Sequence, residues 1–286
     1  MPLFAKKKPG IGIDRPSMEY LSHLGPHRVA AGNLTEAGMP GLVFAPVAGR
    51  GLPAVALSHG WLQPAARYAD TMRYLASWGL VVVAPDTEKG PVPSHEAMAA
   101  DVLTALSLVA DGRLGGGRVS VDAARLGVLG HSIGGGAAVL AAATAPRIGA
   151  VVTVTAAATR PSAVEAAAGV HSPGLHLVGS DDDIAEGDGA ALAAAWSGPA
   201  QLRTVKGASH LGLAEGKHWS STVTGSGDEK RIQQVVRLLA TAFLLRHLTD
   251  QEQLADEIDG KIKGTTLADL GEVQQRDTVS RPAHLE

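Results

Sequence analysis

Short apolar runs alternate with longer segments of helical period along most of the chain, and this alternation constrains the fold more than any other feature. Most of the runs are continuously apolar, which is typical of strands that helices cover on both faces. Alternating strands and helices predict an α/β fold with a mostly parallel central sheet and right-handed crossovers. The predicted strands are 42–44, 54–58, 80–84, 126–129, 151–154, 175–178 and 202–205, and the predicted helices are 65–78, 94–110, 133–144, 188–197 and 229–248.

The 286 residues are expected to form one domain, because sheet-and-helix enzymes of this length often fold as a single unit. We place that domain at 28–250, after an N-terminal tail over 1–27 and before a C-terminal helix and poorly ordered tail over 251–286. The segment 156–173 is long enough for one short helix only, so little or no lid domain is expected. Pro53 is expected to mark the start of a strand. Aromatic residues make up 3% of the chain, which predicts a core of small side chains.

Composition and charge argue against several classes of partner. A net charge of −3 gives no support for a nucleic-acid groove or for binding to an anionic membrane surface. No window approaches the roughly 20 apolar residues of a membrane span. The basic run at 6–8 is followed by Pro9 and Gly10 rather than by the apolar stretch of a signal peptide. The chain has no cysteine, and no His-rich spacing suggests a metal set, so we expect a cytoplasmic protein without metal or cofactor.

The strongest chemical signal is the sequence Gly130-His131-Ser132-Ile133-Gly134, which matches the pattern G-x-S-x-G. An apolar strand runs directly into this motif and a helix of small residues over 137–143 runs directly out of it. A nucleophilic serine needs this strand–turn–helix context, because the tight turn projects the hydroxyl above the sheet. We therefore predict that Ser132 is a nucleophile.

A second loop, Ser58-His59-Gly60-Trp61, also follows a predicted strand. No glycine-rich helix start follows Ser58, so this serine is not expected to be a nucleophile. The loop is better explained as one half of an oxyanion hole, with the backbone N–H of Trp61 as one donor and that of Ile133 as the other. The side chain of His59 is expected to order the loop by hydrogen bonding.

Three consecutive acids, Asp181, Asp182 and Asp183, follow the strand predicted at 175–178. A carboxylate at the carboxyl end of a strand can accept the N–H of a catalytic histidine and fix its tautomer. All three could reach such a histidine, so chemistry alone leaves the choice among them open.

The base is expected on the loop after the last predicted strand, where His210 can swing over the nucleophile. Three other histidines compete with it. His176 lies within a predicted strand, His171 precedes every candidate acid, and His218 lies in a polar loop. His210 also completes the order Ser, Asp, His, which strand–turn–helix serine hydrolases use.

With these motifs in this order, the chain resembles the α/β-hydrolase superfamily over about 28–250, and within it the branch of the dienelactone hydrolases, chlorophyllases and cutinase-like polyester hydrolases. The resemblance rests on the Ser58–Trp61 loop, the segment 76–87, the G-x-S-x-G motif, Asp182-Asp183-Ile184-Ala185 and Gly207-Ala208-Ser209-His210. It implies an α/β-hydrolase fold, ester hydrolysis, a small lid or none, and Asp182 as the acid. Dienelactone hydrolases proper use a Cys nucleophile, where this chain has Ser132.

The expected substrate is a small or accessible ester, bound by a monomer or homodimer. Trp61, Trp219 and His131 are the residues expected to contact it, because aromatic rings near the nucleophile can form a wall for an acyl or alcohol group. Two alternatives remain open. The same triad would serve an acyltransferase or a perhydrolase, and the same fold could belong to a ligand-binding protein without turnover.

Overall fold

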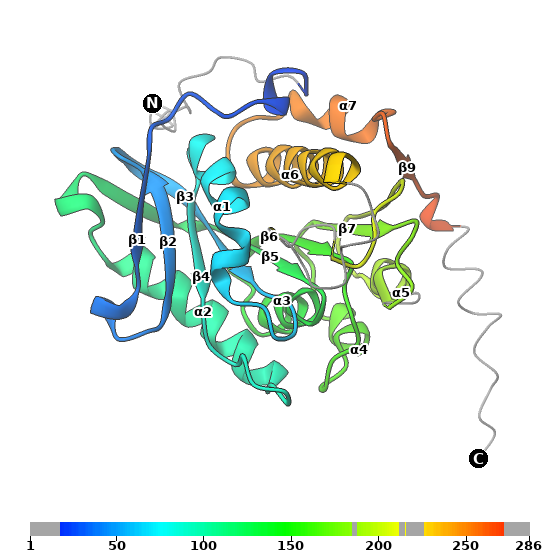
Figure 1. The fold of residues 1–286 in the computed structure, drawn as a ribbon, viewed down its shortest axis with the longest axis horizontal. Coiled ribbons are helices and arrows are strands. Elements are labelled where there is room, and N and C mark those ends of the chain that lie inside the picture. Colours follow the sequence, from blue (N-terminus) through cyan, green and yellow to red (C-terminus); the bar gives the residue numbers. More distant parts are fainter. Residues whose placement is uncertain (1–17, 185–187, 212–214, 216–225, 272–286) are drawn as a thin grey trace, which may run out of the picture.

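A computed structural model describes residues 18–184, 188–211, 215 and 226–271 of the chain (Figure 1). Within these residues, nine strands form one sheet in the order β1-β2-β4-β3-β5-β6-β7-β8-β9. The strands are β1 (Val29–Asn33), β2 (Gly41–Pro46), β3 (Gly49–Ser58), β4 (Val81–Pro85), β5 (Val119–His131), β6 (Ile148–Val154), β7 (Gly174–Gly179), β8 (Ala200–Val205) and β9 (Thr265–Leu267).

The six strands from β3 to β8 run parallel. Strands β2 and β9 pair antiparallel with β4 and β8, and β1 pairs antiparallel with β2 at the edge of the sheet. The sheet is therefore mostly parallel, as the alternation of strands and helices predicts. All seven predicted strands are present. The edge strands β1 and β9 were not predicted, since β1 is largely exposed and β9 has only three residues.

Helices cover both faces of the sheet, with α6 on one side and α2, α3 and α4 on the other (Figure 1). Helices α1 to α5 connect the successive parallel strands β3 to β8, whereas α6 and α7 lie in sequence between β8 and the antiparallel strand β9. Their bounds are α1 (Ala69–Ser77), α2 (His95–Asp111), α3 (Ile133–Thr144), α4 (Ala163–Ala167), α5 (Asp188–Ala195), α6 (Ser226–Leu248) and α7 (Leu254–Asp259), with short 3-10 helices η1 (Tyr20–Ser22), η2 (Thr35–Ala37), η3 (Ala65–Tyr68) and η4 (Gly115–Gly117).

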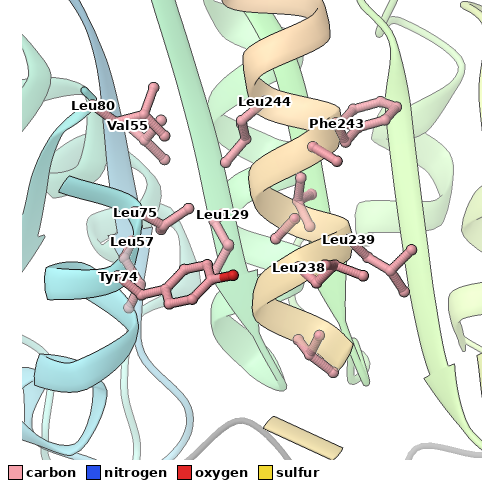
Figure 2. Packing of buried hydrophobic residues seen from close by; sticks show 14 of the residues in the cluster. Val55, Leu57, Tyr74, Leu75, Leu80, Leu129, Leu238, Leu239, Phe243 and Leu244 are labelled. Atoms are coloured by element: carbon pink, nitrogen blue, oxygen red, sulfur yellow. The ribbon is translucent and has the colours of Figure 1, made fainter. Parts of the chain in front are cut away.

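Alternate residues of the central strands divide the core into two layers. In β3, Val55 and Leu57 pack towards α1 and α6, whereas Ala54 and Ala56 pack towards α2 and α3. This follows from the two-residue period of a strand, which sends successive side chains to opposite faces. Figure 2 shows the first layer, where leucines and Phe243 of α6 lie over the sheet. Because both faces are covered, the central strands have no polar face.

Two details differ from the sequence-based expectations. Strand β3 begins at Gly49, so Pro53 lies inside the strand rather than at its start. Part of the segment expected as a tail also has defined structure, because Leu21 of η1 is fully buried and Tyr74 of α1 donates its hydroxyl to the Leu21 carbonyl. The segment 156–173 holds the single short helix α4, as predicted.

Candidate active site

Ser132 lies at the turn between β5 and α3, with φ 56° and ψ −128°. A positive φ at a non-glycine residue costs about 1–3 kcal/mol and persists only where the surroundings enforce it. The neighbouring glycines permit this turn. A Cβ on Gly130 would overlap the carbonyl oxygen of Gly134, and a Cβ on Gly134 would overlap that of Ser58. The motif therefore forms a sharp strand–turn–helix elbow with the serine at its tip.

Three side chains from different parts of the sequence meet at this elbow. The Oγ atom of Ser132 lies 2.7 Å from Nε2 of His210. Both carboxylate oxygens of Asp182 lie 3.1 Å from Nδ1 of the same ring. His210 and Asp182 are nearly buried, with 7% and 5% of their side chains exposed. The acid and the histidine follow β7 and β8, whose carboxyl ends lie on the same edge of the parallel sheet as the end of β5.

Of the three consecutive acids, only Asp182 has a hydrogen bond to His210 among the described residues. Asp181 is exposed and accepts a hydrogen bond from the Ser180 hydroxyl at 2.7 Å. Asp183 is also exposed. Asp182 additionally accepts the backbone N–H of Ile184 at 3.0 Å, which fixes the orientation of its carboxylate.

The competing histidines lie elsewhere. His176 is buried in β7 with its ring against Trp196, and its Nδ1 lies 3.0 Å from the Thr153 hydroxyl. Burial lowers the pKa of His176 to about 3, so it is neutral at ordinary pH. His171 is exposed and lies before the amino end of β7, whereas the triad residues follow the carboxyl ends of their strands. His218 lies outside the described residues.

The loop after β3 packs its backbone against the nucleophile. A Cβ on Gly60 would lie 3.3 Å from the Cβ of Ser132, so only glycine allows this approach without a shift. The two ring nitrogens of His59 lie 2.9 Å from the Gly60 carbonyl oxygen and 2.8 Å from that of Thr87. His59 thereby orders the loop, as expected from the sequence. The Gly60 carbonyl also accepts the N–H of Gln63 at 3.1 Å.

The expected substrate-contacting residues have different surroundings. Trp61 is 51% exposed, and its indole N–H donates to the Pro91 carbonyl at 3.0 Å. His131 has no exposed surface, and both its ring nitrogens have protein partners, the Tyr68 hydroxyl at 2.8 Å and the His210 carbonyl at 2.7 Å. Trp219 lies outside the described residues. Of the two that the structure describes, Trp61 is therefore the one that is exposed to solvent.

Glu215 was not singled out from the sequence, yet it ties the chain after His210 to two helices. Its carboxylate accepts the backbone N–H groups of Asp70 and Thr71 at 2.8 and 2.7 Å, and it pairs with Arg237 of α6 at 2.8 Å. These N–H groups have no partner within α1, because they belong to its first turn. No local sequence signal marks such a contact, since its partners are distant in the chain.

Among the residues that the structure describes, no group of three His, Asp or Glu side chains could hold a metal ion. Within the same ranges, no helix is both long and apolar enough to cross a membrane.

The mostly parallel sheet, with a serine at the turn between its central strand and the next helix, defines an α/β-hydrolase fold. A family model described as PETase, PET hydrolase-like, matches residues 12–250. The chain belongs to this family, which fits the predicted branch and indicates an ester hydrolase. A comparison with curated proteins found no match.

Proposed function

We propose that the chain is a serine carboxylic ester hydrolase in which Ser132 is the nucleophile, His210 the proton carrier and Asp182 the acid that orients it. The observation that carries the proposal is the continuous line of hydrogen bonds from Ser132 Oγ through the His210 ring to Asp182, at 2.7 and 3.1 Å. Such a line lets the ring accept the hydroxyl proton on Nε2 while Nδ1–H stays bonded to the carboxylate.

The reaction proceeds in two halves that return the enzyme to its starting state. In the first, His210 takes the proton of Ser132 as Oγ bonds to the ester carbonyl carbon, and then gives that proton to the departing alcohol oxygen as the C–O bond breaks. In the second, water bonds to the acyl carbon, His210 takes its proton and returns it to Ser132 Oγ, and the carboxylic acid leaves. No oxidant, metal or cofactor is required.

The proposed oxyanion donors are the backbone N–H groups of Ile133 and Trp61. Ile133 is the first residue of α3, so its N–H has no carbonyl partner within the helix and points out of its positive end. The Gly60 carbonyl is occupied by the N–H of Gln63, and in a trans peptide the N–H of Trp61 points the opposite way. Gly60 packs on Ser132, which supports the N–H of the next residue, Trp61, as the second proposed donor.

The substrate side favours an accessible ester. The exposed ring belongs to Trp61, the residue whose backbone N–H is a proposed oxyanion donor, and its indole N–H is held by the Pro91 carbonyl. A fixed aromatic face of this kind can stack on a flat acyl or alcohol group. Membership of the PET hydrolase-like family supports a polyester as one such substrate, with Trp61 contacting the polymer.

Turnover of p-nitrophenyl acetate and release of soluble products from a PET film test the proposal. We expect activity in the wild type and a loss of about 10⁶-fold in kcat for Ser132→Ala. Ser58→Ala is a matched control, because Ser58 occupies the serine position of a similar motif but lies at the end of β3. Activity retained by folded Ser132→Ala would refute the proposal, as would the absence of ester turnover by the folded wild type.

A further inference from the structure

A chain of buried hydrogen bonds links the loop after β3 to the backbone of His210. The N–H of Gly60 donates to the Tyr68 hydroxyl at 3.0 Å, and that hydroxyl lies 2.8 Å from Nδ1 of His131. Nε2 of His131 lies 2.7 Å from the carbonyl oxygen of His210. Thr155 donates its hydroxyl to the same carbonyl at 2.9 Å. Neither Tyr68 nor Thr155 belongs to the proposed triad or oxyanion hole.

The chemistry of the end groups, together with the burial of His131, sets the direction of each bond in this series. A carbonyl oxygen only accepts, so Nε2 of His131 carries a proton and donates it to His210. A backbone N–H only donates, so the Tyr68 oxygen accepts from Gly60. Burial lowers the pKa of His131 to about 4, so at neutral pH the ring carries one proton, on Nε2, and Nδ1 accepts the Tyr68 hydroxyl. His131 is therefore neutral and held in one tautomer by its neighbours.

Burial reinforces this arrangement. Tyr68 and His131 have no exposed surface, and burial lowers the pKa of His131 to about 4 and raises the pKa of Tyr68 above its ordinary value. The rings of His131 and His210 are 5.7 Å apart between centroids. Because His131 resists protonation, His210 can take up a proton during the reaction without a second charged imidazole beside it.

Both ends of this series of hydrogen bonds lie next to groups that the proposed reaction uses. Gly60 precedes Trp61, whose N–H is a proposed oxyanion donor, and a Cβ on Gly60 would lie only 3.0 Å from Nδ1 of His131. The other end holds the main chain of His210. We propose that Tyr68 and His131 are positioning residues that set the oxyanion loop and the catalytic histidine relative to each other. This inference rests on the function proposed above.

The Tyr68→Phe variant tests the link directly, because it removes one oxygen and keeps the ring. It leaves the N–H of Gly60 without an acceptor and Nδ1 of His131 without a donor. We expect kcat for p-nitrophenyl acetate, per serine titrated with a fluorophosphonate, to fall about 10- to 100-fold with little change in KM. Tyr74→Phe is the matched control, since the hydroxyl of Tyr74 bonds to Leu21, away from the site.

A pair of substitutions at His131 separates positioning from packing. His131→Gln keeps an N–H that can reach the His210 carbonyl, whereas His131→Leu fills the space without a donor. We expect His131→Gln to exceed His131→Leu in kcat per titrated serine by about tenfold, the effect of one hydrogen bond. Equal turnover in the two folded variants would show that His131 serves packing alone and would overturn the inference.

A measurement independent of turnover covers the case in which a variant does not fold. In wild-type protein with ¹⁵N-labelled histidine, NMR should show His131 as the neutral Nε2–H tautomer at pH 7. Observation of the Nδ1–H tautomer or of an imidazolium would overturn the inference. Wild-type protein that hydrolyses esters while Tyr68→Phe keeps full kcat would refute the inference and leave the proposed function standing. Wild-type protein that neither labels at Ser132 nor hydrolyses esters would refute both.

Discussion

Replacement of Asp182 by Asn is expected to abolish most of the activity while the fold is kept. Both carboxylate oxygens of Asp182 lie 3.1 Å from Nδ1 of His210, and the pair is nearly buried. An amide nitrogen at this place would donate to Nδ1 and shift the ring proton to Nε2. A ring protonated on Nε2 cannot accept the hydroxyl proton of Ser132.

The size of the effect follows from the charge that the carboxylate stabilises. When His210 takes the serine proton, opposite charges stand about 4 Å apart, and at an effective dielectric of about 20 their attraction is about 4 kcal/mol. Loss of that attraction corresponds to about 10³-fold in rate, because each 1.36 kcal/mol is tenfold. The wrong tautomer adds to this loss, so we expect kcat to fall about 10³- to 10⁴-fold.

The assay is the kcat for p-nitrophenyl acetate, with the unfolding midpoint measured for each variant. Asp181→Asn and Asp183→Asn are matched controls, since both side chains are exposed and belong to the same run of three acids. We expect both controls to stay within about threefold of the wild type. If folded Asp182→Asn loses less than about tenfold, or if a control loses as much, the reasoning about the acid is refuted.

Three further predictions concern stability and are read from urea unfolding. Gly134→Ala should lower the free energy of unfolding by about 1–3 kcal/mol, because the added Cβ overlaps the carbonyl oxygen of Ser58; unchanged stability would contradict this. Glu215→Gln should lower it by about 1.5–3 kcal/mol through the loss of a charged acceptor at the start of α1, and a neutral effect would refute that role. Burial lowers the pKa of His131 to about 4 and that of His176 to about 3, from 6.5. As the pH falls below about 6.5, the unfolded chain therefore takes up these protons and the folded chain does not. The free energy of unfolding should be highest above that pH and decrease towards pH 4. A free energy of unfolding that is equal at pH 7 and pH 4.5 would contradict this sign.

The central strands could be predicted because the sheet is covered on both faces, which makes most of them continuous apolar runs. The edge strand β1 and the first half of β3 could not be predicted in this way. Strand β1 is largely exposed and its apolar residues, 29–31, end at Gly32 and Asn33, so the run is too short to indicate a strand. The first half of β3 contains Gly49, Gly51 and Pro53, which are turn residues in isolation and join the strand only through pairing with β5.

In the candidate site, too, some residues could be predicted from local sequence motifs and others could not. Ser132 and His210 stand in local motifs whose context is readable from the sequence, and the order of elements predicts that they meet. The role of Tyr68 depends on a contact with His131, which is 63 residues away, and no local pattern encodes such a contact. His131 was expected to face the substrate because it adjoins the nucleophile, whereas its side chain is directed into the protein and is fully buried.

Fluorophosphonate labelling of the folded protein, followed by peptide mapping, tests the central claim most directly. The reagent bonds only to an activated serine, so it reads the arrangement of Ser132 and His210 without any assumption about the natural substrate. We expect a single labelled peptide containing Ser132, and no labelling in Ser132→Ala or His210→Ala. Absence of labelling in the folded wild type, or labelling of a different serine, would contradict the account.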